Sequence, residues 1–502
     1  MIEKMLKYNK SYSFVLGALS VLAFSPYYLI PFAFVAFGLW FCLLNKAFSK
    51  KQAFLTGYWF GFGHFAFGFS WIGNALLIDP MQTGWLYPIC FLASGAFFGL
   101  FFGFPSLIAF CYKNVYSRFF IFITSIVFFE WVRSWIFTGF PWNPIGSVFG
   151  SYTVLMQLSS IGGIFFLTMI ALYILTLPTL YLITKNNKII YALFLLIALV
   201  LSFGFYKVSQ YQYNLSDVKV RLVQPAIPQI MKWNKEILEN NFNKYIDMSA
   251  KDNDGVNLTI WGETATPFAL EFEPFYRKQI TKAVPKDGYL ITGLLRYEFE
   301  KDGSYQPLNS MAVINEVGGF VNHYDKSHLV PFGEYIPLRK HLPEFIKPVT
   351  NIIGELKKGE GAKTIKLNNI PSFAASICYE ILFPASNVNR QIKPDFLINL
   401  TNDGWYGKSS GPYQHLLVSQ FRAVEEGLTV IRVANTGISA IISPIGEIIS
   451  QINLDEEGVL DVYLPKQIRI KTIYSFVQNY FVLILMLLIF ILVTIKEKRN
   501  GK

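Results

Sequence analysis

Charged residues are scarce in this sequence of 502 residues. Asp, Glu, Lys and Arg together make up 15% of the chain, against roughly 25% in ordinary soluble domains. Hydrophobic residues make up 53%, and the mean hydropathy is +0.37. This composition excludes an ordinary soluble protein and indicates an integral membrane protein. A long polar stretch at about residues 213–470 nevertheless predicts a soluble domain large enough to bury its own core.

Cysteine and histidine are also rare. Of the four cysteines, Cys42, Cys90 and Cys111 fall in apolar segments, which excludes a disulfide framework. The five histidines show no spacing typical of metal ligands, so we expect neither a metal site nor a cofactor. Cys378 is the only cysteine in the polar domain. A single unpaired thiol in that position favours a chemical role.

Long apolar segments alternate with short loops. Most of them are near the ~20 residues that cross a bilayer. Eight segments are candidates for membrane spans, at about 12–26, 28–45, 54–78, 86–112, 118–137, 160–184, 189–207 and 473–495. The first two are short and separated by Ser25-Pro26, so they could instead form one re-entrant hairpin. The charges of the loops favour two spans.

Basic residues gather in alternate connections. They are Lys4, Lys7, Lys10, Lys46, Lys50, Lys51, Lys113, Arg118, Lys185, Lys188, Lys496, Lys498, Arg499 and Lys502. The other connections, at about 26–28, 79–84 and 139–144, carry no Lys or Arg. By the positive-inside rule both termini lie in the cytoplasm and the polar domain lies outside it. The same loops carry much of the net charge of +11, so we expect no nucleic-acid partner.

The sequence therefore predicts three parts. They are a transmembrane bundle of seven spans at 1–212, a soluble domain at 213–470, and an eighth span with a cytoplasmic tail at 471–502. Within the soluble domain, strand-like runs such as 218–223, 257–261 and 373–377 alternate with helical patterns such as 235–251 and 412–426. This alternation predicts an α/β fold with helices covering sheets.

Two features carry alternatives that the residues alone leave open. Glu130 and Arg133 lie inside the fifth apolar segment, where charge is costly and suggests either function or a structural pair at helical spacing. The segment 340–358 mixes apolar side chains with several lysines. It suits either a helix lying on a membrane surface or a helix packed on its own domain.

Cys378 follows a short apolar run, 371–377, that predicts a buried strand. The next strand is expected at about 395–400, so a crossover helix is expected between the two. A thiol near the N-terminus of a helix has its pKa lowered by backbone N–H groups. The alternative is that Cys378 is simply a small buried apolar residue.

Three more charged residues follow predicted strands in the same domain. Glu263 comes directly after a buried strand, and Lys326 and Glu334 lie in a loop after another. Each residue alone is weak evidence, since a carboxylate at a strand end is usually a cap and a lysine is usually solvated. A carboxylate, a lysine and a thiol at separate strand ends form a more specific pattern, because a thiol nucleophile needs a base and an oxyanion stabiliser.

The chain order Glu263, Lys326, Cys378 resembles the triad of the nitrilase, or carbon–nitrogen hydrolase, superfamily. The flanking segments are similar to a membrane-bound branch of it, the apolipoprotein N-acyltransferases. The similar segments are 138–142, 227–233, 261–265, 326–335, 378–380, 402–407, 411–415 and 435–439. Two departures, Gly262 for a frequent Pro and Pro225-Ala226 for a usual Gly-Asn, affect only loop shape. The resemblance implies an eight-helix transmembrane bundle with an extracytoplasmic αββα sandwich.

The resemblance also implies an activity and a place in the cell. An acyl chain from a phospholipid, typically phosphatidylethanolamine, would form a thioester on Cys378 and then pass to the α-amine of a diacylglyceryl-cysteine on an apolipoprotein, the final step of lipoprotein maturation. The domain would face the periplasm from a bacterial inner membrane. By the same resemblance, Glu263 is the general base, Lys326 stabilises the oxyanion, and Glu334 orients Lys326 or assists proton transfer. The residues implied to shape the pocket are Trp233, Tyr379 and Glu380.

Two other functions fit parts of the pattern. A membrane-tethered amidase of the nitrilase type would use the same triad with water as acyl acceptor. A transporter or scaffold with an external binding domain would need no reactive cysteine. The acyl product distinguishes the amidase, which would release free fatty acid, from the acyltransferase. Replacement of Cys378 distinguishes the transporter or scaffold, whose function would not change.

Overall fold

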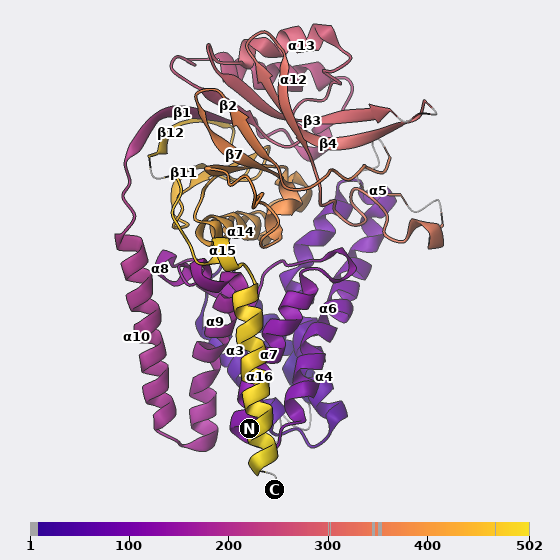
Figure 1. The fold of residues 1–502 in the computed structure, drawn as a ribbon. Coiled ribbons are helices and arrows are strands. Elements are labelled where there is room, and N and C mark those ends of the chain that lie inside the picture. Colours follow the sequence, from indigo (N-terminus) through magenta and orange to yellow (C-terminus); the bar gives the residue numbers. More distant parts are fainter. Residues whose placement is uncertain are drawn as a thin grey trace. The chain divides into compact units, whose positions relative to one another are not determined.

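The computed structural model describes residues 9–299, 301, 303–343, 347–349, 354–466 and 468–500. The chain divides into two compact units (Figure 1). The helical unit comprises Met1–Gln210, Val424–Glu426 and Thr472–Lys502, and the sheet unit comprises Tyr211–Ala423 and Gly427–Lys471.

The helical unit consists of long apolar helices joined by short turns. Its helices are α2 (Asn9–Ser20), α3 (Pro31–Asn45), α4 (Lys50–Gly68), α5 (Pro80–Thr83), α6 (Tyr87–Phe110), α7 (Val115–Arg133), α8 (Thr153–Met156), α9 (Ser159–Thr184), α10 (Lys188–Ser209), α15 (Tyr474–Val477) and α16 (Tyr480–Asn500). Side-chain caps set some of the starts: Ser49 accepts from the Gln52 N–H before α4, and Asn114 accepts from the first N–H groups of α7. Gly17 and Gly63 let α2 and α4 approach closely, because a Cβ on either would collide with the facing backbone.

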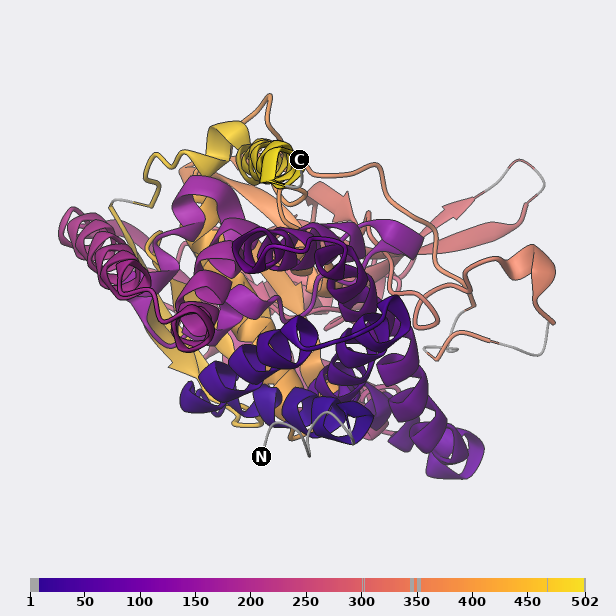
Figure 2. The same cartoon turned by 90° about the horizontal axis from the view of Figure 1, so that it is seen from below.

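Five helical segments of the described chain are long and apolar enough to cross a membrane. They are Pro80–Phe110, Val115–Arg133, Ser159–Thr184, Lys188–Ser209 and Tyr480–Arg499. Helices α2, α3 and α4 occupy the other three predicted segments with 12, 15 and 19 residues. Figure 2 shows α10 and α16 at the outside of the helical group. Accordingly, only 17% of the most apolar stretch of α10 and 11% of that of α16 is buried. The count of eight spans and their orientation stay predictions.

Glu130 and Arg133 both anchor backbone next to α7. Glu130 accepts hydrogen bonds from the Ile145 N–H at 2.8 Å and the Thr168 hydroxyl at 3.0 Å. Arg133 donates to the carbonyl oxygens of Phe140 and Trp142, at 2.6 and 2.8 Å. Both charged side chains are 2% exposed, and they fasten the irregular segment 138–149 to the helix. Of the two alternatives, these contacts favour the structural one.

The sheet unit is built on two six-stranded sheets. The strand orders are β12-β1-β2-β3-β4-β5 and β11-β10-β9-β8-β7-β6. The strands are β1 (Leu215–Gln224), β2 (Leu258–Trp261), β3 (Tyr289–Phe299), β4 (Tyr305–Asn315), β5 (Phe320–Asp325), β6 (Thr364–Leu367), β7 (Ile370–Ile377), β8 (Phe396–Thr401), β9 (Thr429–Ala434), β10 (Ser439–Ile442), β11 (Ile448–Ile452) and β12 (Gly458–Pro465). Parallel pairs, β1–β2–β3 and β7–β8–β9, lie at the centre of each sheet. Their carboxyl ends therefore share an edge in each sheet.

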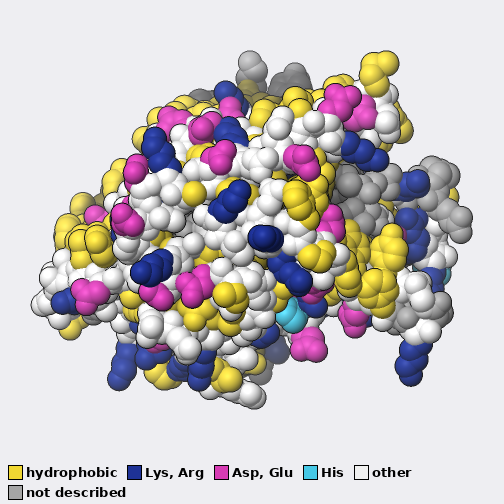
Figure 3. Space-filling view, turned by 90° about the horizontal axis from the view of Figure 1, so that it is seen from above, with side chains coloured by type: hydrophobic (Ala, Val, Ile, Leu, Met, Phe, Trp, Pro, Cys, Tyr) yellow, Lys and Arg dark blue, Asp and Glu magenta, His cyan; other side chains and the backbone are white. Residues whose placement is uncertain are grey.

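Helices cover the outer faces of the sheets. One core lies between the sheets, where Leu222 and Ile260 of the first meet Ile398 of the second. A second core packs Trp261 and Leu290 against α12 (Leu238–Ala250) and the turns around α13 (Pro274–Ile280). Helix α14 (Ser410–Glu426) is mostly buried and covers the second sheet (Figure 1). The face seen in Figure 3 carries interspersed acidic and basic side chains, as expected of a water-exposed surface.

The connection between β7 and β8 differs from the one expected from the sequence. The prediction of a crossover helix there is wrong. The connection holds only a five-residue 3₁₀ turn, Cys378–Leu382, because Pro384 follows at once and a helix cannot run through it. The helix predicted for 340–358 falls partly outside the described residues, and its described part contains only the end of a 3₁₀ turn, Arg339–His341.

Candidate active site

Cys378 stands at the carboxyl end of β7 in a strained turn. Its φ angle is +50°, in the left-handed region that a side chain with a Cβ occupies only at a cost of about 1–3 kcal/mol. Its side chain hydrogen-bonds Thr401 at the end of the neighbouring parallel strand β8, and the residue is 5% exposed. The turn places Cys378 at the sheet edge where the parallel strands β7 and β8 end.

Glu380 fixes this turn to the loop that follows β5. Its Oε2 accepts from the Ile377 N–H at 2.7 Å. Its Oε1 accepts from the Tyr324 hydroxyl at 2.7 Å and from the Ser327 N–H and hydroxyl at 2.6 and 2.9 Å. The His328 N–H adds a longer bond at 3.1 Å. The carboxylate is thus occupied by protein donors, which makes Glu380 a positioning group for Cys378 and for the Lys326 loop.

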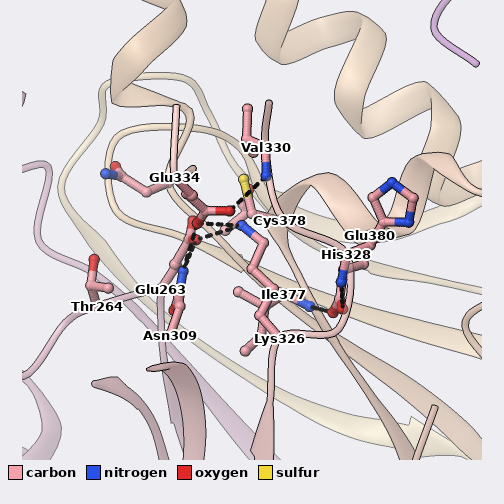
Figure 4. Close-up of polar contacts among 12 residues, drawn as sticks. Glu263, Thr264, Asn309, Lys326, His328, Val330, Glu334, Ile377, Cys378 and Glu380 are labelled. Atoms are coloured by element: carbon pink, nitrogen blue, oxygen red, sulfur yellow. Dashed lines mark hydrogen bonds and ion pairs between the residues drawn. The ribbon is translucent and has the colours of Figure 1, made fainter. Parts of the chain in front are cut away.

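Beside the thiol lie two carboxylates and an ammonium group (Figure 4). Lys326 Nζ is 2.8 Å from Glu334 Oε1 and 3.4 Å from Glu263 Oε1. Asn309 of β4 donates to both acids through Nδ2, at 2.7 Å to Glu263 and 3.1 Å to Glu334. Glu334 Oε2 accepts from the Val330 N–H at 2.8 Å. The structure brings all four predicted groups, Glu263, Lys326, Glu334 and Cys378, into one buried cluster.

The charges in the cluster explain the pKa values there. Burial and the nearby Glu263 carboxylate raise the pKa of the Cys378 thiol to about 12. Burial alone would lower the pKa of Lys326, but Glu334 and Glu263 outweigh it and raise that pKa. The expected lowering of the thiol pKa by a helix is therefore wrong, because only a short turn follows Cys378. At neutral pH the resting nucleophile is a protonated thiol beside a carboxylate.

A pocket of about 70 Å³ opens onto this cluster. Its lining residues are Gln229, Trp233, Glu263, Thr264, Leu295, Asn309, Glu334, Gly354, Leu356, Asn402 and Trp405. Trp233, which the resemblance implies to shape the pocket, is one of these lining residues. Tyr379 does not line the pocket: its ring packs against Phe383 at 5.1 Å and His328 at 5.8 Å between centroids.

A second polar group lies beneath the nucleophile turn. His415 of α14 has Nε2 3.3 Å from the Cys378 carbonyl oxygen and Nδ1 2.8 Å from Asp403 Oδ1. Arg432 of β9 donates to Asp403 Oδ2 at 2.6 Å. Arg432 and His415 outweigh burial and lower the pKa of Asp403 to about 2. This ionised acid orients the imidazole that touches the nucleophile's own carbonyl.

Sequence reasoning assigned no individual role to Asn309, Lys232, Asp403, His415 or Arg432. Lys232, Asp403 and His415 lie within the segments that carry the resemblance, which was the one available signal. Asn309 lies inside β4, next to the apolar run that predicted the strand, and no motif or spacing marked it as a site residue. No group of three or more His, Cys, Asp or Glu side chains in the described residues is arranged to hold a metal ion.

Comparison with known proteins covers both units. The family described as "Carbon-nitrogen hydrolase" matches residues 219–471. The family described as "Apolipoprotein N-acyltransferase N-terminal domain" matches residues 16–177. The first match confirms the expected nitrilase-like fold for the C-terminal half.

Curated relatives extend the similarity over almost the full chain. A Rickettsia typhi protein described as "Apolipoprotein N-acyltransferase" is 36% identical over 481 residues, covering 95% of this chain and 96% of the relative. A Rhodopseudomonas palustris protein of the same description is 34% identical over 509 residues, covering 97% and 94%. One from Brucella melitensis is 35% identical over 477 residues, covering 90% and 89%.

Proposed function

This chain belongs to the apolipoprotein N-acyltransferase family, and we propose that it carries out lipoprotein N-acylation in two steps through a thioester on Cys378. The protein is an acyltransferase of the membrane that acts on lipid and lipoprotein substrates. The proposed acyl donor is phosphatidylethanolamine, and the proposed acceptor is the α-amine of a diacylglyceryl-cysteine at the N-terminus of an apolipoprotein. The observation that carries the mechanism is the buried cluster of thiol, carboxylates and ammonium group around Cys378.

The first step transfers the acyl chain to sulfur. Glu263 accepts the thiol proton as Sγ attacks the ester carbonyl, because a thiol with a pKa of about 12 cannot ionise beforehand at neutral pH. Lys326 donates a hydrogen bond to the oxygen that becomes negative. The C–O bond then breaks, Glu263 returns the proton to the leaving oxygen, and lysophospholipid departs.

The second step reverses these roles for an amine. The neutral α-amine attacks the thioester carbonyl and passes a proton to Glu263. Lys326 again stabilises the oxyanion. The C–S bond then breaks, and Glu263 passes its proton to the leaving sulfur, which restores the Cys378 thiol and the Glu263 carboxylate. A thioester suits this exchange, since it stores acyl-transfer potential and lets two large lipids use one pocket in turn.

Neighbouring residues hold the reacting groups in place. Glu334, at 2.8 Å from Lys326 Nζ, orients the ammonium group. Trp233 forms part of the wall of the pocket beside Glu263, which is the proposed place of the acyl group. Tyr379 and Glu380 act through the nucleophile turn, Glu380 by its bonds to Ile377 and Ser327.

The proposed topology follows from the charges of the loops. Residues 1–212 form seven spans of the bacterial inner membrane, 213–470 form the catalytic domain in the periplasm, and 471–502 form the eighth span and a cytoplasmic tail. Both termini are cytoplasmic. Tethering at both ends keeps the catalytic domain at the bilayer surface, where both substrates lie.

The test uses purified full-length protein with phosphatidylethanolamine and a synthetic diacylated lipopeptide. The expected product is the triacylated lipopeptide, detected by mass spectrometry, with lysophospholipid as the co-product. Release of free fatty acid alone would instead favour a membrane-tethered amidase. The Cys378→Ala protein should give neither product, whereas a transporter or scaffold would be unaffected by that change.

A further inference from the structure

A second lysine is buried beside the proposed base. Lys232 lies at the end of the short helix α11 (Gln229–Lys232) and is 6% exposed. Its Nζ donates to the Glu263 backbone carbonyl at 2.8 Å and to the Thr264 hydroxyl at 2.7 Å. An ammonium group is expensive to bury unless its environment compensates for the lost water. The two hydrogen bonds to Glu263 and Thr264 are therefore the contacts that hold the ammonium group in this buried position.

The bonds of Lys232 hold the turn that carries Glu263. Thr264 has φ +45°, a left-handed conformation that a threonine adopts only under constraint. On the other side of the turn, the Glu263 N–H donates to the Thr401 carbonyl at 3.3 Å. Thr401 also bonds the thiol of Cys378. Glu263 and Cys378 are therefore both hydrogen-bonded to Thr401 at the end of β8. Lys232 holds the Glu263 turn from the opposite side, through the Glu263 carbonyl and the Thr264 hydroxyl.

Lys232 also balances the charge of the cluster. Glu263, Glu334 and Lys326 together carry one excess negative charge when all three are ionised, and Lys232 brings the sum to zero. Its ammonium interacts electrostatically with both Glu263 and Cys378. It therefore favours negative charge on either partner as the proton moves between them.

We propose that Lys232 is the positioning residue of the general base: it fixes the Glu263 turn toward Cys378 and supplies the positive charge that leaves Lys326 available to the oxyanion. This inference rests on the proposed role of Glu263 as base. Lys232 bonds the backbone of Glu263, not its carboxylate, so it acts through that residue and does not touch the acyl group.

The ionisation of Lys232 gives this role a pH signature. Burial lowers the pKa of Lys232 to about 8. The titratable groups that interact with it are Glu263 and Cys378, and the thiol of Cys378, with a pKa of about 12, stays protonated over the range tested. Lysine is charged below its pKa, so the supporting charge is present below about pH 8 and lost above it.

The experiment measures the rate of thioester formation on full-length protein given phosphatidylethanolamine alone, from pH 6 to 9.5. The variants are Lys232→Met and Lys232→Arg. Lys244→Met is the matched control, because Lys244 also bonds a backbone carbonyl, that of Pro225, at 2.7 Å but pairs with Glu457 and is 36% exposed. We expect Lys232→Met to lower the rate about a hundredfold at unchanged KM.

The Lys232→Arg protein separates positioning from mere packing. A guanidinium stays charged throughout this pH range. We expect it to recover most of the rate and to abolish the loss that the wild-type protein shows above about pH 8. A Met variant with wild-type rate and pH profile overturns the proposal. If the Met variant does not fold, an Arg variant with an unshifted alkaline loss overturns it equally. Absence of any adduct in the wild-type protein would instead reject the proposed function itself.

Discussion

Lys326 Nζ bonds Glu334 Oε1 at 2.8 Å, and the two side chains are 1% and 7% exposed. The distance from the same ammonium group to Glu263 Oε1 is 3.4 Å. Lys326 is thus held chiefly by Glu334, which leaves Glu263 freer to take a proton from the thiol. The two carboxylates are alike in chemistry and differ in their distance from one lysine.

This asymmetry predicts unequal effects for two isosteric changes. Glu263→Gln removes the base and should slow thioester formation by about 10³–10⁴-fold. Glu334→Gln should slow it by only about 10²-fold, because Lys326 then shifts toward Glu263 and competes with its proton transfer. Both rates are measured by quenched reactions and intact mass. A Glu334→Gln protein slower than the Glu263→Gln protein would reverse the assignment of base and positioning carboxylate.

The raised pKa of the thiol predicts how Cys378 reacts with iodoacetamide. Only the thiolate is nucleophilic, and a pKa of about 12 leaves about one thiol in 10⁵ ionised at pH 7. In a protein carrying Ala at the other three cysteine positions, the alkylation rate should rise about tenfold per pH unit from 7 to 10. A plateau below pH 8 would show instead a thiolate stabilised in the resting enzyme.

Glu380 offers a prediction about stability. Replacing it with Ala leaves the buried donors of Ile377, Tyr324 and Ser327 without their acceptor, and each charge-assisted bond contributes about 1.5–3 kcal/mol. We expect a loss of about 3 kcal/mol or more in unfolding free energy and a clear fall in Tm of the detergent-solubilised protein. Glu457→Ala is the control, since that side chain is 55% exposed. Equal Tm values for both variants would rule out the positioning role of Glu380.

The predicted orientation in the membrane can be tested with single cysteines. In a background lacking the native cysteines, Lys408→Cys on the sheet unit, where the lysine side chain is 80% exposed, should react with a membrane-impermeant maleimide in spheroplasts. Lys498→Cys in the tail should react only after lysis. The Lys408 ion pair with Asp455 lies at the surface and contributes little, so the change should not disturb the fold. Labelling of the tail before lysis would invert the proposed topology.

The sequence predicted well those parts of the fold that depend on local pattern. Apolar runs located β2, β7 and β8, and the helical pattern at 412–426 located α14. Glu263, Lys326 and Cys378 could then be identified as residues that follow strands, here β2, β5 and β7. The prediction of a crossover helix after β7 was wrong because it did not take into account Pro384, which interrupts a helix at that point.

The rest of the site depends on contacts between distant segments. Asn309 bridges two acids that lie 46 and 25 positions away in the chain, and His415 meets Cys378 across 37 positions. The thiol pKa depends on burial and on Glu263, neither of which a single strand end reveals. Polar partners that are far apart in the chain show no periodic pattern in a single sequence, so the folded structure is needed to identify them.

The most direct test of the account is the mass of the full-length protein after incubation with phosphatidylethanolamine and no acceptor. We expect the mass to rise by one acyl group, hydroxylamine to remove it, and proteolysis to map it to Cys378. The Cys378→Ala protein should stay unmodified, while Cys42→Ala, Cys90→Ala and Cys111→Ala should be acylated as the wild type is. An adduct on another residue, or lipopeptide acylation that persists in the Cys378→Ala protein, would contradict the account.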